Sequence, residues 1–172
     1  ERLQIQLFAT FFLAGISMYT CLKNFFLSRT ASLIGAVIYL GCGFFVGNAE
    51  HFQHINTMAF FPLALMLINR LISAPNVYNL SLAALAIPLI AFCGYPSMLV
   101  NSLYVFFAFA LLKIFFIDRG GRREDVLKRI TFLISFFVLG LCASAILLIP
   151  AFQNAFLSVR GQGAPLESIK AH

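Results

Sequence analysis

One short polar segment of this chain concentrates the side chains that could carry chemistry. Residues 48–56 read Asn-Ala-Glu-His-Phe-Gln-His-Ile-Asn and lie between two long apolar runs. A carboxylate can act as a general base or hold a cation, and a histidine can contact a phosphate or titrate near neutral pH. We call this segment the polar island and predict the functional site there. Its candidate residues are Asn48, Glu50, His51, Gln53, His54 and Asn56.

Glu50 is the candidate catalytic residue of the polar island. The chain has six acidic residues, of which three fall in segment 118–125 and two lie near the ends of the chain. Glu50 is therefore the only carboxylate in an internal loop that we expect to face outward. Two interpretations stay open: Glu50 acts as a general base or holds a cation beside a phosphate, or it is a solvated loop acid.

The order Glu50-His51-x-x-His54 resembles a metal-binding pattern only superficially. The zinc-protease motif needs His-Glu-x-x-His, with histidines four residues apart and the glutamate between them. Here the glutamate precedes both histidines, which are three residues apart. We therefore expect no zinc site, and we expect His51 and His54 to contact a phosphate or sugar hydroxyl, the alternative being interfacial histidines without a role. The sequence does not specify a cofactor, and a divalent cation is one candidate.

The composition predicts a membrane protein. Hydrophobic residues make up 61% of the chain and charged residues 10%, with a mean hydropathy of +0.93, which no soluble domain of this length could bury. Apolar runs long enough to span a bilayer follow one another. We predict one all-α transmembrane bundle over residues 1–172, an excerpt of a larger protein because it opens without Met. Its expected spans are 3–22, 31–47, 57–72, 80–93, 97–117 and 130–149, with an outer tail at 150–172.

Charge placement predicts the orientation of the bundle. Lys23 and Arg29 follow the first span, Arg70 ends the third, and five basic residues lie between the fifth and sixth. Because basic residues collect in cytoplasmic loops, these connections should face the cytoplasm. The net charge of +6 thus has an explanation in topology, and no nucleic-acid partner is expected. We expect Lys113, near a cytoplasmic end, to extend to the membrane surface.

Helix-packing signals are few. Gly43 and Gly47 form a small-xxx-small pattern, which we expect to bring helices close together within the chain. Pro88 predicts a kink in the fourth span. The cysteines show no paired spacing and are expected to be ordinary core residues.

Three segments resemble the YfhO-type bacterial membrane proteins, a family similar to the GT-C class of glycosyltransferases. Residues 50–70 resemble an outer loop that leads into a span with an aromatic-Pro-Leu motif, here Phe61-Pro62-Leu63. Residues 94–97, Gly-Tyr-Pro-Ser, stand in the place of a Gly-His-Pro-polar turn. Residues 148–160 resemble a Leu-Leu-Pro-x-x-Glu segment that ends in Ser-Val-Arg. Tyr95 stands where histidine is common, and Gln153 where glutamate is common.

The resemblance implies a transferase that moves a sugar from a polyprenyl-phosphate donor to a cell-envelope acceptor, on the outer face of the bacterial cytoplasmic membrane. Its partners would be that lipid-linked sugar and membrane lipids. Tyr95, Gln153 and Arg160 join the polar island as expected substrate-binding residues. The principal catalytic acid of such proteins would lie upstream of residue 1. Two alternatives stay open: a transporter or flippase of lipids or solutes, and a catalytically silent envelope-assembly scaffold.

Overall fold

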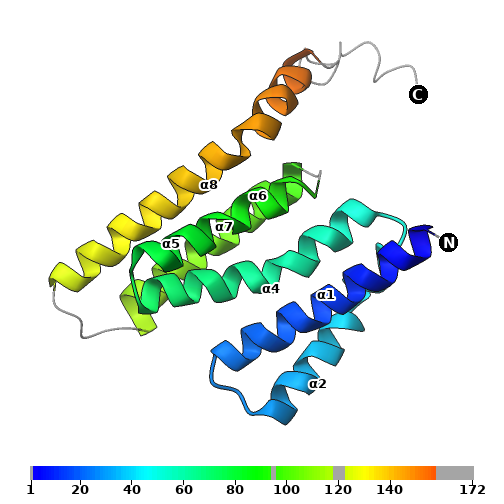
Figure 1. The fold of residues 1–172 in the computed structure, drawn as a ribbon, viewed down its shortest axis with the longest axis horizontal. Coiled ribbons are helices and arrows are strands. Elements are labelled where there is room, and N and C mark those ends of the chain that lie inside the picture. Colours follow the sequence, from blue (N-terminus) through cyan, green and yellow to red (C-terminus); the bar gives the residue numbers. More distant parts are fainter. Residues whose placement is uncertain (1, 94–95, 118–122, 158–172) are drawn as a thin grey trace, which may run out of the picture.

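The chain forms an all-α bundle, as predicted. A computed structural model describes residues 2–93, 96–117 and 123–157, and all the regular structure in these ranges is helical. Figure 1 shows the helices roughly side by side. In chain order they are α1 (Arg2–Asn24), α2 (Arg29–Leu40), α3 (Gly43–Gly47), α4 (Phe52–Ser73), α5 (Val77–Ala84), α6 (Ala86–Ala91), α7 (Pro96–Leu112), the π-helix η1 (Lys113–Ile117) and α8 (Arg123–Leu157).

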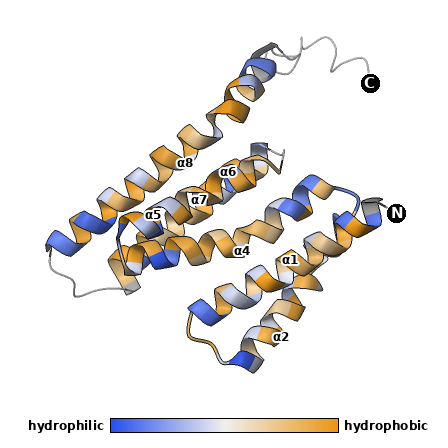
Figure 2. Cartoon of the chain, viewed as in Figure 1, coloured by the Kyte–Doolittle hydropathy of each residue, from blue (hydrophilic) through white to orange (hydrophobic). Residues whose placement is uncertain are grey.

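Most of the helical segments have the length and composition of membrane spans. Within the described ranges, five are long and apolar enough to cross a bilayer: Gln4–Asn24, Arg29–Gly47, Phe52–Ser73, Pro96–Phe116 and Glu124–Asn154. The apolar segment Val77–Ala91 is shorter. Figure 2 shows hydrophobic residues along most of each helix and hydrophilic residues mainly near the helix ends. This distribution is that of a multi-pass membrane protein.

Two of the expected spans are divided into shorter helices. The fourth breaks at Leu85, between α5 and α6, three residues before Pro88. A proline has no N–H to donate to the carbonyl four residues earlier, so the kink predicted from Pro88 is confirmed. The expected span 31–47 also breaks, because Gly41 ends α2 and Cys42 is extended. By contrast, α8 continues through Pro150 to Leu157, beyond the predicted span end at residue 149.

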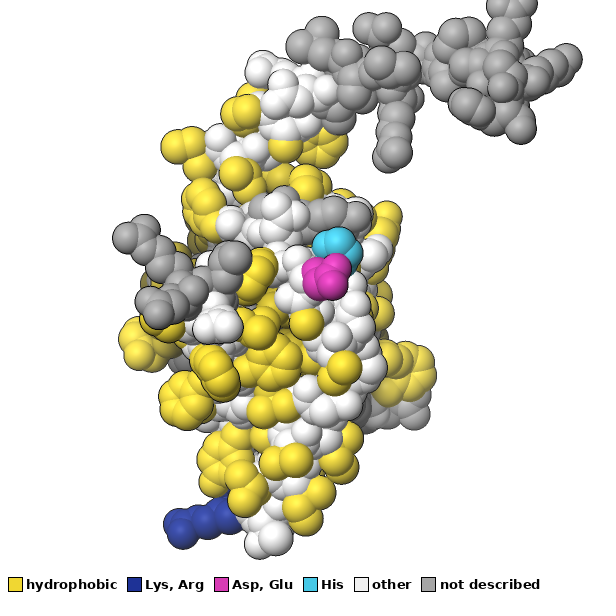
Figure 3. Space-filling view, turned by 90° about the vertical axis from the view of Figure 1, so that its right-hand side faces the viewer, with side chains coloured by type: hydrophobic (Ala, Val, Ile, Leu, Met, Phe, Trp, Pro, Cys, Tyr) yellow, Lys and Arg dark blue, Asp and Glu magenta, His cyan; other side chains and the backbone are white. Residues whose placement is uncertain are grey.

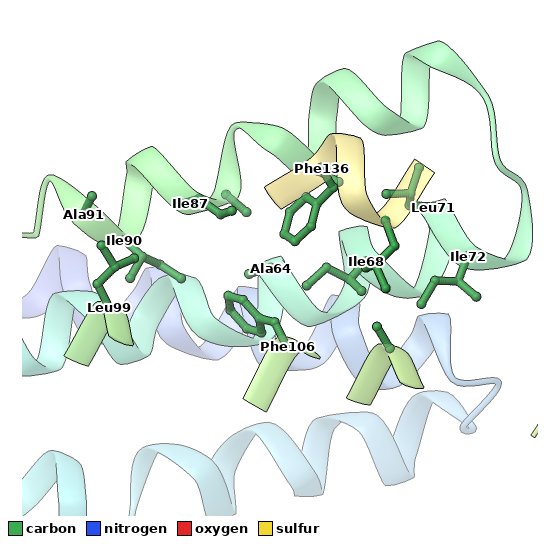
Figure 4. Packing of buried hydrophobic residues seen from close by; sticks show 14 of the residues in the cluster. Ala64, Ile68, Leu71, Ile72, Ile87, Ile90, Ala91, Leu99, Phe106 and Phe136 are labelled. Atoms are coloured by element: carbon green, nitrogen blue, oxygen red, sulfur yellow. The ribbon is translucent and has the colours of Figure 1, made fainter. Parts of the chain in front are cut away.

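Helix α4 lies at the centre of the bundle. It packs against α1 on one side and against α5, α6 and α7 on the other, while α2 covers α1 and α8 packs against α5 and α6. The larger hydrophobic core forms where α4, α6, α7 and α8 meet (Figure 4). Ile68, Ile87, Phe106 and Phe136 represent these four helices there, and each is fully buried. Because α4 contacts both sides of the bundle, it holds the polar island in place.

The close helix approaches do not use the predicted glycine pair. An added Cβ at Gly43 or Gly47 would have no atom within 4 Å, so the expected packing through this pattern is wrong. At Gly140 in α8, an added Cβ would lie 2.4 Å from Cδ1 of Ile87 in α6. At Gly35 in α2, it would lie 2.4 Å from Cδ1 of Leu22 in α1. Spacing alone does not specify which glycines meet another helix, because the pattern contains no information about the partner.

Helices α1 and α4 run parallel and are joined by one side-chain hydrogen bond near each end. The Thr10 hydroxyl donates to Oδ1 of Asn56, with 2.7 Å between the oxygens. Nδ2 of Asn69 donates to Oδ1 of Asn24 over 2.6 Å. The first bond lies toward the outer end and the second toward the end predicted to be cytoplasmic.

The bond between Asn69 and Asn24 belongs to a buried polar network. Nζ of Lys113, at the junction of α7 and η1, donates to Oδ1 of Asn69. The side chains of Lys113 and Asn69 are 9% and 6% exposed. The expectation that Lys113 extends to the membrane surface is therefore wrong. An amide acceptor inside the bundle takes the place of solvent, as is usual for charged groups at membrane depth.

Candidate functional site

A cavity of about 380 Å³ opens between α1, α4 and α6, on the half of the bundle that is predicted to face outward. We call it the outer pocket. Polar groups of α1 and α4 form one part of its lining, and aromatic side chains of α4 and the end of α6 form another. The lining residues used below are Gln6, Thr10, Asn56, Phe60 and Phe92. The combination of a few polar groups with an apolar and aromatic wall is typical of small-molecule sites.

The Thr10–Asn56 hydrogen bond lies in the wall of the outer pocket. The Thr10 hydroxyl lies 2.7 Å from Oδ1 of Asn56 and 3.0 Å from the carbonyl of Gln6, so its single proton serves these two acceptors. With Oδ1 facing Thr10, the Nδ2 amide of Asn56 can donate to a ligand. The bond therefore orients Asn56 as well as joining two helices.

Gln53 extends the polar wall outward. It precedes Asn56 by three residues on α4, and Phe60 follows Asn56 by four, so the three share one helix face. Gln53 is exposed and Asn56 half-buried. Two amide side chains thus lead from the surface to the outer pocket.

The two histidines lie on a different face of α4. His51 is the residue at the N-terminal boundary of the helix, and its ring meets that of His54 edge-on, with 5.2 Å between centroids. His54 shares its helix face with Phe61, seven residues later, and Phe61 stacks on Phe106 of α7. The histidine pair is therefore directed toward α7, whereas Asn56 is directed toward α1.

Glu50 is exposed in the turn immediately before α4. Figure 3 shows an acidic and a histidine side chain next to each other on one face, with a basic side chain at the far end of that face. Glu50 precedes His51 by one residue and Gln53 by three, so it lies close in sequence to both faces of α4. A carboxylate in this position is accessible at the end of the bundle that is predicted to face outward.

The remaining predicted binding residues have different surroundings. Asn48 donates its Nδ2 to the carbonyl of Phe44 over 2.9 Å, which caps the end of α3. Gln153 is exposed on the last turns of α8, which project beyond the other helices in Figure 1. Tyr95 and Arg160 lie outside the described residues. Of the predicted binding residues that the structure describes, Asn56 lines the outer pocket, Gln53 lies one turn before it on the same helix face, and Gln153 is not in the lining.

Gln6 and Thr10 are site residues that the sequence reasoning missed. They lie four residues apart in a mostly apolar span, and therefore on one helix face. Polar pairs at membrane depth usually face the protein interior. That spacing was the signal that could have found them.

Metal binding finds no support in the described part of the chain. No group of three or more His, Cys, Asp or Glu side chains is close enough there to hold a metal ion.

A comparison with protein families decides the family of the chain. The model of the family described as bacterial membrane protein YfhO matches residues 7–169. The chain belongs to this family. No curated protein and no solved structure matches it. The match covers the polar island and most of the outer-pocket lining, so this YfhO-family chain is a multi-pass bacterial membrane protein whose candidate site lies in the matched region.

In this YfhO-family chain, Thr10→Val is expected to lower the free energy of unfolding by about 0.6 to 1.7 kcal/mol, the range for hydrogen bonds between membrane helices. The bond to Asn56 is lost while the side-chain shape is kept. Thr20→Val is the matched control, because the Thr20 hydroxyl donates only to carbonyls of its own helix. Denaturant titration in mixed micelles measures both. An equal loss of unfolding free energy in the two variants would show that the hydrogen bond between Thr10 and Asn56 does not stabilise the fold.

Proposed function

We propose that this chain forms part of a membrane glycosyltransferase that uses a polyprenyl-phosphate-linked sugar. The observation that carries the proposal is the outer pocket, in which amide and hydroxyl groups of Gln6, Thr10 and Asn56 face the same cavity as Phe60 and Phe92. A sugar ring presents hydroxyl groups at its edge and C–H groups on its faces. Amides pair with the hydroxyls, and aromatic rings pack against the C–H faces.

The polar island supplies groups that suit the rest of the reaction. The acceptor hydroxyl oxygen attacks the anomeric carbon, and the bond from that carbon to the phosphate oxygen breaks. Glu50 takes the acceptor proton, and polyprenyl phosphate leaves as an anion. Gln53 and Asn56 position the sugar, and His51 and His54 stay proposed contacts of the lipid-linked substrate. Asn48, Tyr95, Gln153 and Arg160 stay proposed contacts of the lipid-linked substrate.

The orientation of the bundle supports a site on the outer face of the cytoplasmic membrane. The outer pocket and the polar island lie at the end of the bundle opposite Lys23 and Arg70. Lipid-linked sugars keep their polyprenyl chain in the bilayer, so a site at membrane depth can take the sugar without extracting the lipid. The exposed apolar surface of the helices provides the lipid contact.

The test is sugar transfer from polyprenyl-phosphate donors by the full-length protein in proteoliposomes. Glu50→Gln is expected to lower turnover about 100-fold or more, because a general base contributes 10²- to 10⁴-fold. Glu124→Gln is the matched control, since this exposed carboxylate begins α8 at the other end of the bundle.

Three outcomes separate the alternatives. Turnover lost only in Glu50→Gln supports the proposed catalytic role. Equal turnover in wild type and Glu50→Gln keeps the enzyme but removes Glu50 as its base. No turnover with any polyprenyl-phosphate sugar contradicts the proposed function and favours a transporter or a scaffold.

A further inference from the structure

Two cavities meet at Tyr19, near the end of the bundle that is predicted to be cytoplasmic. The first, of about 390 Å³, is lined by Tyr19, Thr20, Lys23, Asn24, Phe26 and Arg70, and we call it the inner pocket. The second, of about 320 Å³, lies between α1 and α2, and we call it the lateral groove. Tyr19 lines both. The two cavities together offer a polar compartment next to an apolar one.

The inner pocket is suited to an anion. Its lining contains two cations, Lys23 and Arg70, and no carboxylate among the described residues. Nζ of Lys23 donates to the carbonyl of Leu27 over 3.3 Å, which leaves two of its three protons for another acceptor. Arg70 is exposed at the end of α4 and offers the planar donor fork that matches a phosphate. Thr20 and Tyr19 add hydroxyl groups.

Phe26 has an unusual backbone at the rim of the inner pocket. Its φ is +64°, and it is 97% exposed. For a residue other than glycine this left-handed conformation costs about 1 to 2 kcal/mol. No burial of the ring within the bundle offsets that cost. Such an outlier points to a role for the side chain, and an aromatic ring at the membrane interface is well placed to contact a lipid.

The inner pocket and the lateral groove together match the depth of one lipid leaflet. The lateral groove is lined by apolar side chains such as Phe12, Ile16 and Val37. From Lys23 back to Phe12 is eleven residues along α1, or about 16 Å at 1.5 Å per residue. That length is about half of a hydrocarbon core of roughly 30 Å. The inner pocket and the lateral groove together thus extend from the headgroup level on the side predicted to be cytoplasmic to about the bilayer centre, the depth of one leaflet.

We propose that the inner pocket and the lateral groove together bind one glycerophospholipid with an anionic headgroup, taken from the cytoplasmic leaflet. Its phosphate lies between Lys23 and Arg70, and one acyl chain follows α1 and α2 past Tyr19. The apolar groove that continues from the basic pocket favours a lipid over free phosphate. This site lies on the opposite side of the membrane from the outer pocket and does not depend on the proposed function.

The test is lipid titration of the full-length protein in detergent, with native mass spectrometry as the readout and phosphatidylglycerol and phosphatidylcholine as probes. Each basic residue near an anionic lipid contributes about 1 kcal/mol, a factor of about five in affinity. Lys23→Gln/Arg70→Gln is therefore expected to weaken phosphatidylglycerol binding about 30-fold. Arg29→Gln/Lys128→Gln removes the same charge on the same side outside the pocket lining and is expected to leave binding unchanged.

Three further measurements test the groove and the fold. Val37→Trp fills the groove at an exposed position. It should weaken the binding of long-chain phosphatidylglycerol more than the binding of the dihexanoyl form. Phe26→Gly should raise the free energy of unfolding while lowering lipid affinity, since it relieves backbone strain and removes the ring. Inorganic phosphate at millimolar concentration should not displace the long-chain lipid.

The proposal is overturned if phosphatidylglycerol and phosphatidylcholine bind equally, or if both charge variants weaken binding equally. It is also overturned if Val37→Trp leaves long-chain binding unchanged, or if phosphate displaces the lipid. Unfolding curves of the pocket variant that match the wild type exclude misfolding as the cause of lost binding.

Discussion

Asn69→Leu is expected to lower the free energy of unfolding by about 3 kcal/mol. The Asn69 side chain accepts a hydrogen bond from Lys113 and donates one to Asn24, and all three residues come from different helices. Leucine keeps the size of the side chain but removes both bonds, and the ammonium group of Lys113 loses its amide partner inside the bundle. Hydrogen bonds to charged groups contribute about 1.5 to 3 kcal/mol, and a buried group that loses its partner costs more.

The matched variant is the double replacement Asn69→Leu/Lys113→Met. It removes the amide and the buried charge together, so no ammonium group is left inside the bundle without the Asn69 amide. We therefore expect the double variant to be more stable than Asn69→Leu alone. Unfolding in mixed micelles at increasing denaturant measures both. If the loss of unfolding free energy in the double variant equals the sum of the losses in Asn69→Leu and Lys113→Met, the two residues are not coupled.

Gly140→Leu is expected to cost about 3 kcal/mol or more and to separate α8 from α6. Even the Cβ of a side chain at this position would lie 2.4 Å from Cδ1 and 2.9 Å from Cβ and Cγ1 of Ile87. Ile87 is fully buried, so the strain is relieved only by moving a helix. Overpacking in a core typically costs about 1 to 3 kcal/mol, and here the contact involves the stem of a branched side chain.

Gly47→Leu is the control for that experiment. Nothing lies within 4 Å of a Cβ added at Gly47, so its substitution should change stability by less than about 0.5 kcal/mol. The same unfolding assay compares the two, and cysteine crosslinking between α6 and α8 reports their separation. Equal effects at both glycines would show that the approach of α8 to α6 does not limit stability.

The helical segments were predictable because lipid leaves the backbone few alternatives. A polypeptide in hydrocarbon must satisfy its own hydrogen bonds, so long apolar runs become helices whatever their neighbours are. The break beside Pro88 follows from one missing N–H and was also predictable. The break at Gly41 was not, since glycine is common inside membrane helices. Nor was the continuation of α8 through Pro150, because a proline does not by itself specify whether a helix ends or bends.

The position of the candidate site was predictable, but its composition only in part. Polar residues are costly in lipid, which made the polar island conspicuous, and the structure places one of its residues, Asn56, in the lining of a pocket. The contribution of Thr10 depends on the parallel pairing of α1 with α4, between residues 46 positions apart in the sequence. The burial of Lys113 depends likewise on Asn69, 44 positions away. Local spacing contains no information on such pairings.

The two cross-links between α1 and α4 also determine which wall of the outer pocket can move. Thr10 and Asn24 are fourteen residues apart on α1, and Asn56 and Asn69 thirteen apart on α4, so about 20 Å of both helices lies between the links. Sliding α1 along α4 by one helical turn would break both hydrogen bonds at once. The two helices therefore behave as one rigid unit. Leu89 of α6, with Phe92 and Cys93 after it, forms the third wall of the outer pocket. Since Gly140 seats α8 directly on Ile87 of α6, any displacement of this wall would carry α8 with it.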